Sequence, residues 1–149
     1  MTKAPAFTLL NQDNQEVSLD DFKGKRVLLF FFPKADTPGC TAQACGFRDH
    51  FPEITQHDAT VIGMSPDSPE QLKKWKEKEH LPYTLLSDPD HTIATAYGVW
   101  EQKSMFGKKY FGITRSHFVI DEQGNLKIEA RKVSPFDSVK KGTASVIKD

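Results

Sequence analysis

The chain has 149 residues, of which 38% are hydrophobic and 27% charged, and its 20 basic residues balance 20 acidic ones. This length and composition are typical of one globular domain that buries a core without disulfides, so we expect residues 1–149 to form a single domain. The balanced charge gives no reason to expect nucleic acid or an anionic membrane as a partner. No apolar run is long enough to span a bilayer, and the N-terminus lacks the apolar region of a signal peptide. We therefore expect a cytoplasmic protein.

Strands and helices are predicted to alternate in the first half of the chain. Residues 7–10 and 16–19 flank a polar turn, which predicts an N-terminal β-hairpin. Residues 27–32 are all apolar, which indicates a central strand covered on both faces. A helix is expected from Cys40 to about Phe51, and Pro52 is expected to end or kink it.

The second half continues the alternation. A serine, a proline and a glutamine at 68, 69 and 71 form a strong helix start, and Gly98 is a suitable left-handed cap for a later helix. The remaining predicted elements are strands at 60–65 and 83–86, a helix at 91–97, a hairpin of 116–120 with 126–130, and a last helix from about Phe136. Together they predict an α/β fold with a mixed sheet and helices on both faces.

Cys40 lies just beyond the carboxyl end of the predicted central strand. Active sites of α/β folds of this type lie outside the carboxyl ends of the parallel strands. Cys40 also begins a helix, where unpaired backbone N–H groups and the positive end of the dipole favour the reactive thiolate. Pro33 ends the strand and turns the chain away from the sheet. Thr37 can place a hydroxyl beside Cys40, and it can equally cap the helix.

Two residues farther along the chain complete the candidate site. Cys45 follows Cys40 by five positions, and paired cysteines in a reducing compartment are more often catalytic or redox-active than structural. Arg115 begins a buried strand, and its guanidinium would stabilise a thiolate and hold two oxygens at once. Two alternatives stay open: Cys45 as a packing residue while another thiol serves Cys40, and Arg115 as a surface charge.

The histidines and lysines point to no other site. The five histidines are scattered and show no zinc-ligand spacing with the two cysteines. A Cys-His hydrolase would need a paired histidine, and His117 is the one that lies close to Arg115 in the sequence. The lysines at 73–76 and 108–109 are interpreted as solvated faces.

At these residues the sequence resembles the peroxiredoxins. Pro33, Thr37 and Cys40 have the spacing of the active-site motif of that family, and Arg115 lies where the family keeps its arginine. The resemblance runs from roughly residue 4 to 130, and Phe32 stands where many members carry tyrosine. Stretches similar to the bacterioferritin comigratory protein (PrxQ) branch are 32–34, 37–41, 44–45, 47–49, 86–88, 96–100 and 112–116.

The resemblance implies a thioredoxin-like fold, a three-layer α/β/α sandwich, and reduction of hydrogen peroxide and organic hydroperoxides. Cys40 would be the peroxidatic thiolate that becomes a sulfenic acid, and Cys45 would condense with it to an intramolecular disulfide. Thr37 and Arg115 would orient the peroxide. The resemblance also implies a thioredoxin or glutaredoxin-like reductant, a monomer, and no metal or organic cofactor.

Helix geometry adds a prediction about the two cysteines. In one regular helix, residues five apart have Cα atoms separated by roughly 8–9 Å. A disulfide needs less than about 7 Å. The first turns of the helix would therefore have to unwind before Cys40 and Cys45 can join.

Two other functions use the same cysteines. A general disulfide oxidoreductase normally carries Cys-x-x-Cys, whereas here four residues separate the cysteines. A redox-sensing or chaperone-like binding protein would use the same switch with little turnover.

Overall fold

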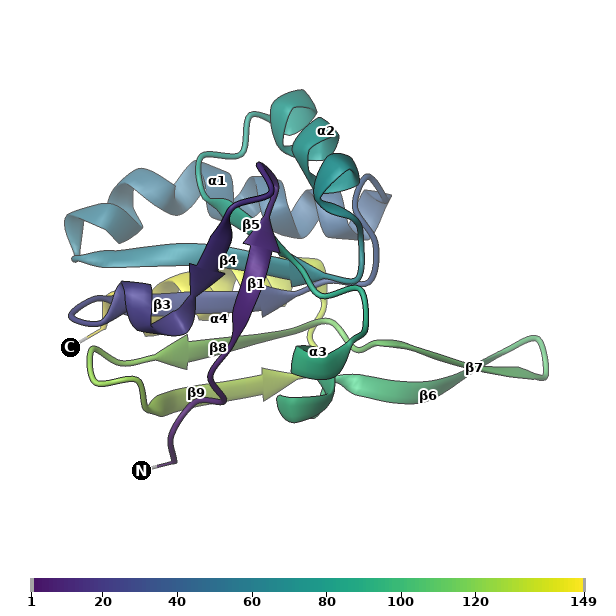
Figure 1. Ribbon diagram of the computed structural model, residues 1–149. Coiled ribbons are helices and arrows are strands. Elements are labelled where there is room, and N and C mark those ends of the chain that lie inside the picture. The colour runs from purple at the N-terminus through teal and green to yellow at the C-terminus, as the bar shows by residue number, and fades with distance from the viewer. Residues whose placement is uncertain (1, 149) are drawn as a thin grey trace.

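A computed structural model of the chain describes residues 2–148. Its main sheet has seven strands in the order β2-β1-β5-β4-β3-β8-β9, with β3, β4 and β5 parallel and the outer strands antiparallel (Figure 1). The prediction of a mixed central sheet is confirmed. The strands are β1 (Thr8–Asn11), β2 (Glu16–Ser18), β3 (Arg26–Phe31), β4 (Ala59–Ser65), β5 (Thr84–Ser87), β8 (Ser116–Ile120) and β9 (Leu126–Arg131).

Helices cover both faces of this sheet. The long helices α1 (Pro38–Gln56), α2 (Pro69–Glu79) and α4 (Pro135–Ile147) contribute to one apolar cluster. The short helices η1 (Leu19–Phe22) and α3 (Thr92–Ala96) contribute to a second cluster on the other face. Alternate residues of β3 enter the two clusters, and all six are buried, as a central strand requires.

The sequence signals for helix ends act as predicted. The Ser68 hydroxyl accepts a hydrogen bond from the Gln71 N–H, and the Gln71 side chain accepts one from the Ser68 N–H. Gly98 has φ +72° just beyond α3. The last helix begins at Pro135, one residue before the predicted start, because the Ser134 hydroxyl accepts a hydrogen bond from the Asp137 N–H.

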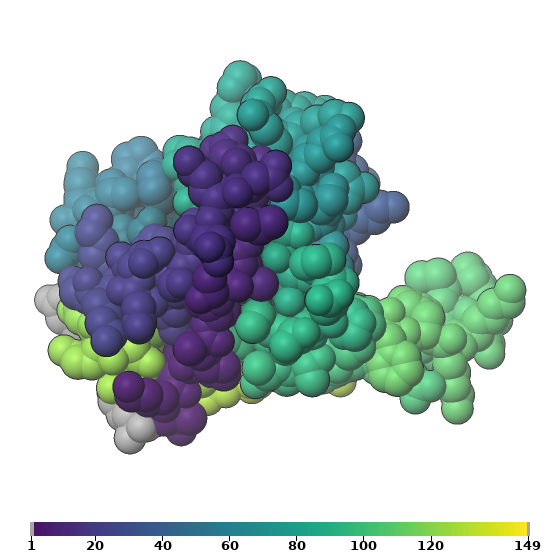
Figure 2. Space-filling view, viewed as in Figure 1, coloured from purple at the N-terminus to yellow at the C-terminus, as the bar shows by residue number. Residues whose placement is uncertain are grey.

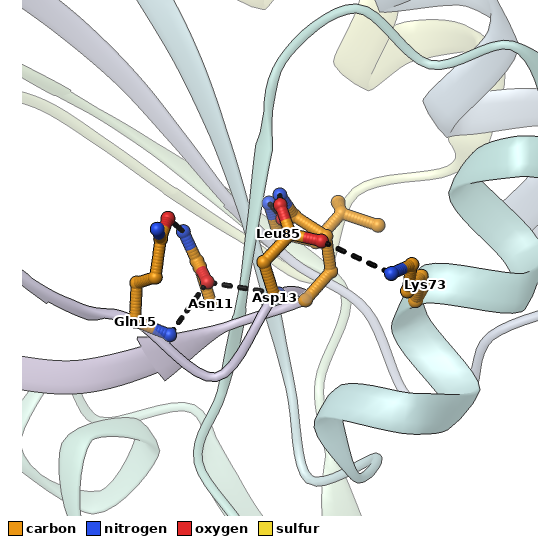
Figure 3. Close-up of polar contacts among 6 residues, drawn as sticks. Asn11, Asp13, Gln15, Lys73 and Leu85 are labelled. Carbon is orange, nitrogen blue, oxygen red and sulfur yellow. Dashed lines mark hydrogen bonds and ion pairs between the residues drawn. The ribbon is translucent and has the colours of Figure 1, made fainter.

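The N-terminal hairpin is also confirmed, and its turn is fixed by side chains (Figure 3). The side-chain oxygen of Asn11 accepts from the backbone N–H groups of Asp13 and Gln15. Lys73 on α2 forms an ion pair with Asp13 at 3.6 Å. The turn between β1 and β2 is thereby attached to α2.

The prediction that helix α1 ends near residue 51 is wrong. The helix begins two residues before Cys40 and continues through Pro52 to Gln56. Proline removes one hydrogen bond inside a helix, but Phe47 and Ile54 remain on the buried face on either side of it. The free energy gained by burying Ile54 in this last turn outweighs the cost of the hydrogen bond that Pro52 removes.

A third hairpin, which the sequence did not reveal, stands away from the main sheet. Its strands β6 (Trp100–Met105) and β7 (Lys108–Ile113) pair with each other as a separate two-stranded sheet. It projects from the body as an arm (Figures 1 and 2).

Among residues 2–148, no helix is long and apolar enough to cross a membrane.

Candidate active site

Cys40 is the third residue of α1 and is 1% exposed. The first hydrogen bond that enters this helix runs from the Thr41 N–H to the Thr37 carbonyl, at 2.8 Å. The N–H groups of Gly39 and Cys40 precede that bond and have no partner inside the helix. The thiol thus lies at the positive end of a 19-residue helix, a position that favours negative charge.

The loop between β3 and α1 is attached to its surroundings by short hydrogen bonds. Strand β3 ends at Phe31, before Pro33, as predicted. The Asp67 carboxylate accepts from the Ala35 N–H and from the Ser65 hydroxyl, each at 2.7 Å. Lys78 on α2 pairs with Asp36 at 2.9 Å. These contacts fix the approach of the chain to Cys40.

Arg115 reaches Cys40 from the start of β8. Its Nη1 lies 3.5 Å from the Cys40 sulfur and donates to the Gln43 side-chain oxygen at 2.8 Å. A Cβ atom at Gly39 would lie 2.9 Å from the Arg115 Nη2. The glycine therefore permits the guanidinium to lie against the first turn of α1.

Thr37 occupies the cap position of α1, but its hydroxyl does not bond the helix. It donates instead to the Lys34 carbonyl at 2.8 Å, across the loop. Its oxygen lone pairs remain able to accept a hydrogen bond. The structure brings Arg115 to Cys40, and Thr37 precedes Cys40 by three residues at the cap of the same helix.

Cys45 lies on the same helix in a different environment. It is half-buried, and its sulfur donates to the Glu79 carboxylate at 3.5 Å. Burial raises the pKa of the Cys45 thiol; the nearby Arg48 opposes this rise and Glu79 adds to it. Both cysteines are free and share one helix, which is the arrangement that the unwinding prediction assumed.

Two aromatic side chains hold the first turns of α1 against the body. The Trp75 indole N–H donates to the Thr41 hydroxyl at 3.2 Å. The Tyr83 hydroxyl donates to the Ala44 carbonyl at 2.7 Å, and burial raises the pKa of Tyr83 well above its usual value. Both contacts fall between Cys40 and Cys45 in the chain.

Sequence analysis missed three polar residues behind Arg115. Gln43 also bonds Ser138 on α4, and Ser138 bonds His117 on β8, each at 2.9 Å. Burial, with Lys141 as a second cause, lowers the pKa of His117 to about 4. His117 is thus a partner of Ser138, not a cysteine-activating base. A glutamine three residues after Cys40 was the available signal, because residues three apart share a helix face.

Lys103 in the arm is another cation near the site. Its ammonium group donates to the Ile113 carbonyl, two residues before Arg115. Burial lowers the pKa of Lys103, and the charge of Arg115 lowers it further. The arm therefore adds positive charge to the same edge of the molecule.

Comparison with known proteins agrees with this geometry. A sequence model of the AhpC/TSA family matches residues 1–128. A putative peroxiredoxin bcp of Haemophilus influenzae is 53% identical over 124 residues, which cover 83% of this chain and 80% of that protein. Peroxiredoxin Bcp of Bacillus subtilis is 49% identical over 137 residues, covering 92% and 87%.

Solved structures show the same fold. Bacterioferritin comigratory protein of Xanthomonas campestris superposes with a TM-score of 0.89 at 28% identity, covering 94% of this chain and 89% of that one. Peroxidoxin BcpB of Mycobacterium tuberculosis gives a TM-score of 0.85 at 32% identity, covering 97% and 93%. The predicted thioredoxin-like fold is confirmed.

Fold and relatives together define a thiol-dependent peroxidase, as the motif predicted. The chain belongs to the AhpC/TSA family and, within it, to the bacterioferritin comigratory protein (PrxQ) branch of the peroxiredoxins.

Proposed function

We propose that Cys40 is the peroxidatic residue, and the contact of its sulfur with Arg115 at 3.5 Å is the observation that carries this proposal. The thiolate attacks one peroxide oxygen, so that an S–O bond forms and the O–O bond breaks. The other oxygen leaves, takes a proton from solvent and becomes water or an alcohol, while Cys40 becomes a sulfenic acid. Arg115 and Thr37 orient the peroxide, and the guanidinium stabilises charge on the leaving oxygen. Pro33 shapes the loop that presents them.

Cys45 is the resolving residue in this proposal. Its thiolate attacks the Cys40 sulfenic acid, a disulfide forms, and the sulfenic oxygen leaves as water after protonation. Both cysteines lie in α1, so the turns between them must unwind first. A dithiol reductant then reduces the disulfide by thiol–disulfide exchange.

The reductant is proposed to be a thioredoxin or glutaredoxin-like protein, and the enzyme a cytoplasmic monomer whose residues 1–149 form one domain. Both hydrogen peroxide and organic hydroperoxides are proposed as substrates. The X. campestris neighbour has alkyl peroxide reduction activity, which supports the organic class. The buried position of Cys40 among apolar side chains supports it as well.

Mass spectrometry after one equivalent of hydrogen peroxide tests the two-cysteine cycle. The reduced wild type is expected to lose two hydrogens, and Cys45→Ser is expected to trap a sulfenic acid on Cys40. Slow or absent oxidation of both proteins would refute the role of Cys40. A disulfide-linked dimer of Cys45→Ser would keep Cys40 as the peroxidatic residue and place resolution in another chain. Steady-state peroxide consumption with a thioredoxin system then tests the reductant.

A further inference from the structure

A buried row of hydrogen bonds connects Arg115 to strand β8 and helix α4. Arg115 donates to Gln43, the Gln43 amide nitrogen contacts the Ser138 hydroxyl, and that hydroxyl contacts Nδ1 of His117, at 2.8, 2.9 and 2.9 Å. Gln43, Ser138 and His117 are 0%, 0% and 1% exposed. Water therefore does not compete for the two bonds that join these three residues, whereas the bond to Arg115 is part-buried.

The guanidinium at one end sets the direction of the first two bonds in the row. A guanidinium has only donors, so the Gln43 oxygen must face Arg115 and its NH₂ group must face Ser138. The Ser138 oxygen accepts from that NH₂ group, and we assign to neutral His117 the tautomer with its proton on Nε2, so that the Ser138 hydroxyl donates to Nδ1. Bonds that run in one direction reinforce each other, so His117 at one end helps to orient the guanidinium at the other.

We propose that Ser138 and His117 are positioning residues of the peroxidase, which act through Gln43 to hold Arg115 against Cys40 and to hold the first turns of α1 closed. This inference rests on the proposed roles of Cys40, Cys45 and Arg115. It assigns a function in the catalytic cycle to α4 and β8, two elements that carry neither cysteine.

The second part of the proposal follows from the place of Gln43 in the chain. Gln43 lies between the two cysteines, so unwinding of that segment withdraws its side chain from Arg115 and Ser138 together. Ser138 then loses a buried hydrogen bond, and Arg115 loses a part-buried one. One buried hydrogen bond of typical net strength changes an equilibrium constant about fivefold. The row therefore favours the closed helix that binds peroxide and opposes the open helix that forms the disulfide.

Tryptophan fluorescence can separate these two steps. Trp75 bonds Thr41 in the turns that must open, so its emission is expected to report both oxidation of Cys40 and unwinding of α1. A Trp100→Phe background removes the second tryptophan signal. In stopped-flow mixing with hydrogen peroxide, Cys40 oxidation gives a phase that depends on peroxide concentration. Disulfide formation gives a later phase that does not, and Cys45→Ser removes it.

Ser138→Ala interrupts the row without touching the catalytic residues. We expect the peroxide-dependent rate constant to fall about fivefold and the disulfide-forming rate constant to rise about fivefold, as loss of one hydrogen bond implies. His117→Phe removes the acceptor and is expected to change both phases in the same directions. His117→Asn restores an acceptor of similar reach and is expected to return both phases toward the wild-type values.

Thr143→Val is the matched control. Thr143 is buried on the same helix, and its hydroxyl has no hydrogen-bond partner among residues 2–148. Its replacement is expected to leave both phases unchanged. If Ser138→Ala does not fold, the His117→Phe and His117→Asn pair gives the same comparison.

Two outcomes would contradict the proposals, and they differ. A lower melting temperature in Ser138→Ala and His117→Phe with wild-type rate constants for both phases would show a purely structural row and overturn the inference. Absence of the two phases in the wild type itself would overturn the two-cysteine cycle, and the inference with it.

Discussion

Cys40 and Cys45 are five residues apart on one helix, yet their sulfur atoms have different hydrogen-bond partners. Cys40 is almost fully buried and contacts the Arg115 guanidinium. Cys45 is half-buried and donates its hydrogen to the Glu79 carboxylate. A carboxylate that accepts this hydrogen stabilises the thiol and disfavours the thiolate. The burial of Cys45 and its contact with Glu79 thus favour the thiol while the helix is closed, although Arg48 opposes this effect.

This environment predicts how disulfide formation depends on pH. Attack by Cys45 requires its thiolate, and the pKa of Cys45 is raised, first by burial and also by Glu79. The thiolate fraction, and with it the resolving rate, should therefore rise steadily from pH 6 toward the raised pKa. Glu79→Gln removes the negative charge, lowers the pKa of Cys45 and should increase the disulfide-forming rate at pH 7 by about threefold to tenfold.

Stopped-flow traces at several pH values measure this effect directly. Glu77→Gln removes an exposed carboxylate two residues away on α2 and is the matched control. If Glu79→Gln and Glu77→Gln follow the same pH profile as the wild type, the opening of the helix governs the rate instead. The ionisation of Cys45 would then have no effect on the rate of disulfide formation.

At this scale the sequence identified the reactive groups and missed the residues that position them. Cys40, Thr37 and Pro33 lie within eight positions, so their spacing alone revealed the motif. Ser138 and His117 carry no reactive pattern, and they meet Gln43 only after α1, α4 and β8 have packed. Their proximity depends on the tertiary structure and cannot be predicted from the spacing of residues in the sequence.

Helices α1 and α4 pack closely at one glycine. A Cβ atom at Gly46 would lie 2.4 Å from Cγ2 of Val139, far inside normal contact distance. The glycine thus lets α4 approach the segment that carries both cysteines. A regular helix would otherwise favour alanine there by about 1 kcal/mol.

A double-mutant cycle tests this contact. Gly46→Ala should lower the free energy of unfolding by about 1–3 kcal/mol, because the added methyl overpacks the interface. Val139→Ala should relieve the clash, so that the double variant is more stable than the two single changes predict, by about 1–2 kcal/mol. Urea denaturation of the four proteins measures the coupling. Additive free energies would show that α4 shifts away from α1 without cost.

Elements with strong local sequence signals were predictable, and the arm, which lacks them, was not. The apolar run of β3 and the capping box of α2 carry strong local signals, and both were predicted. The helix end predicted at Pro52 is wrong, because a rule based on the hydrogen bond that proline removes does not include the burial of Ile54 beyond it. The arm lacks the alternation of a half-buried strand, since most of β7 is exposed. The sequence indicated a solvated face at Lys108 and Lys109 and no hairpin.

The whole molecule consists of a closely packed body and a protruding arm (Figure 2). The arm exposes large apolar side chains, among them Phe106 at 97% and Phe111 at 59%. A two-stranded hairpin is only marginally stable by itself. We therefore expect amides of residues 102–111 to exchange with solvent far faster than those of β3, as measured by hydrogen–deuterium exchange.

Shortening the arm tests whether it belongs to the cooperative unit. Lys103 and Tyr110 are partners in the β6–β7 ladder, so a two-residue Asn-Gly turn can replace residues 104–109. The melting temperature should change by less than about 3 °C, because no core contact is lost. A loss comparable to that of a core substitution would show that the arm supports the body. Slow exchange of its amides would lead to the same conclusion.

The tip of the arm has a practical use. Gly107 has φ +78°, and a Cβ atom there would meet no other atom within 4 Å. Exposed loop tips of this kind accept inserted sequences well. A fluorescent protein or an affinity tag placed at this position would be held away from the fold while remaining on the edge that carries Lys103 and Arg115. The arm therefore offers a handle for building a peroxide sensor from this chain.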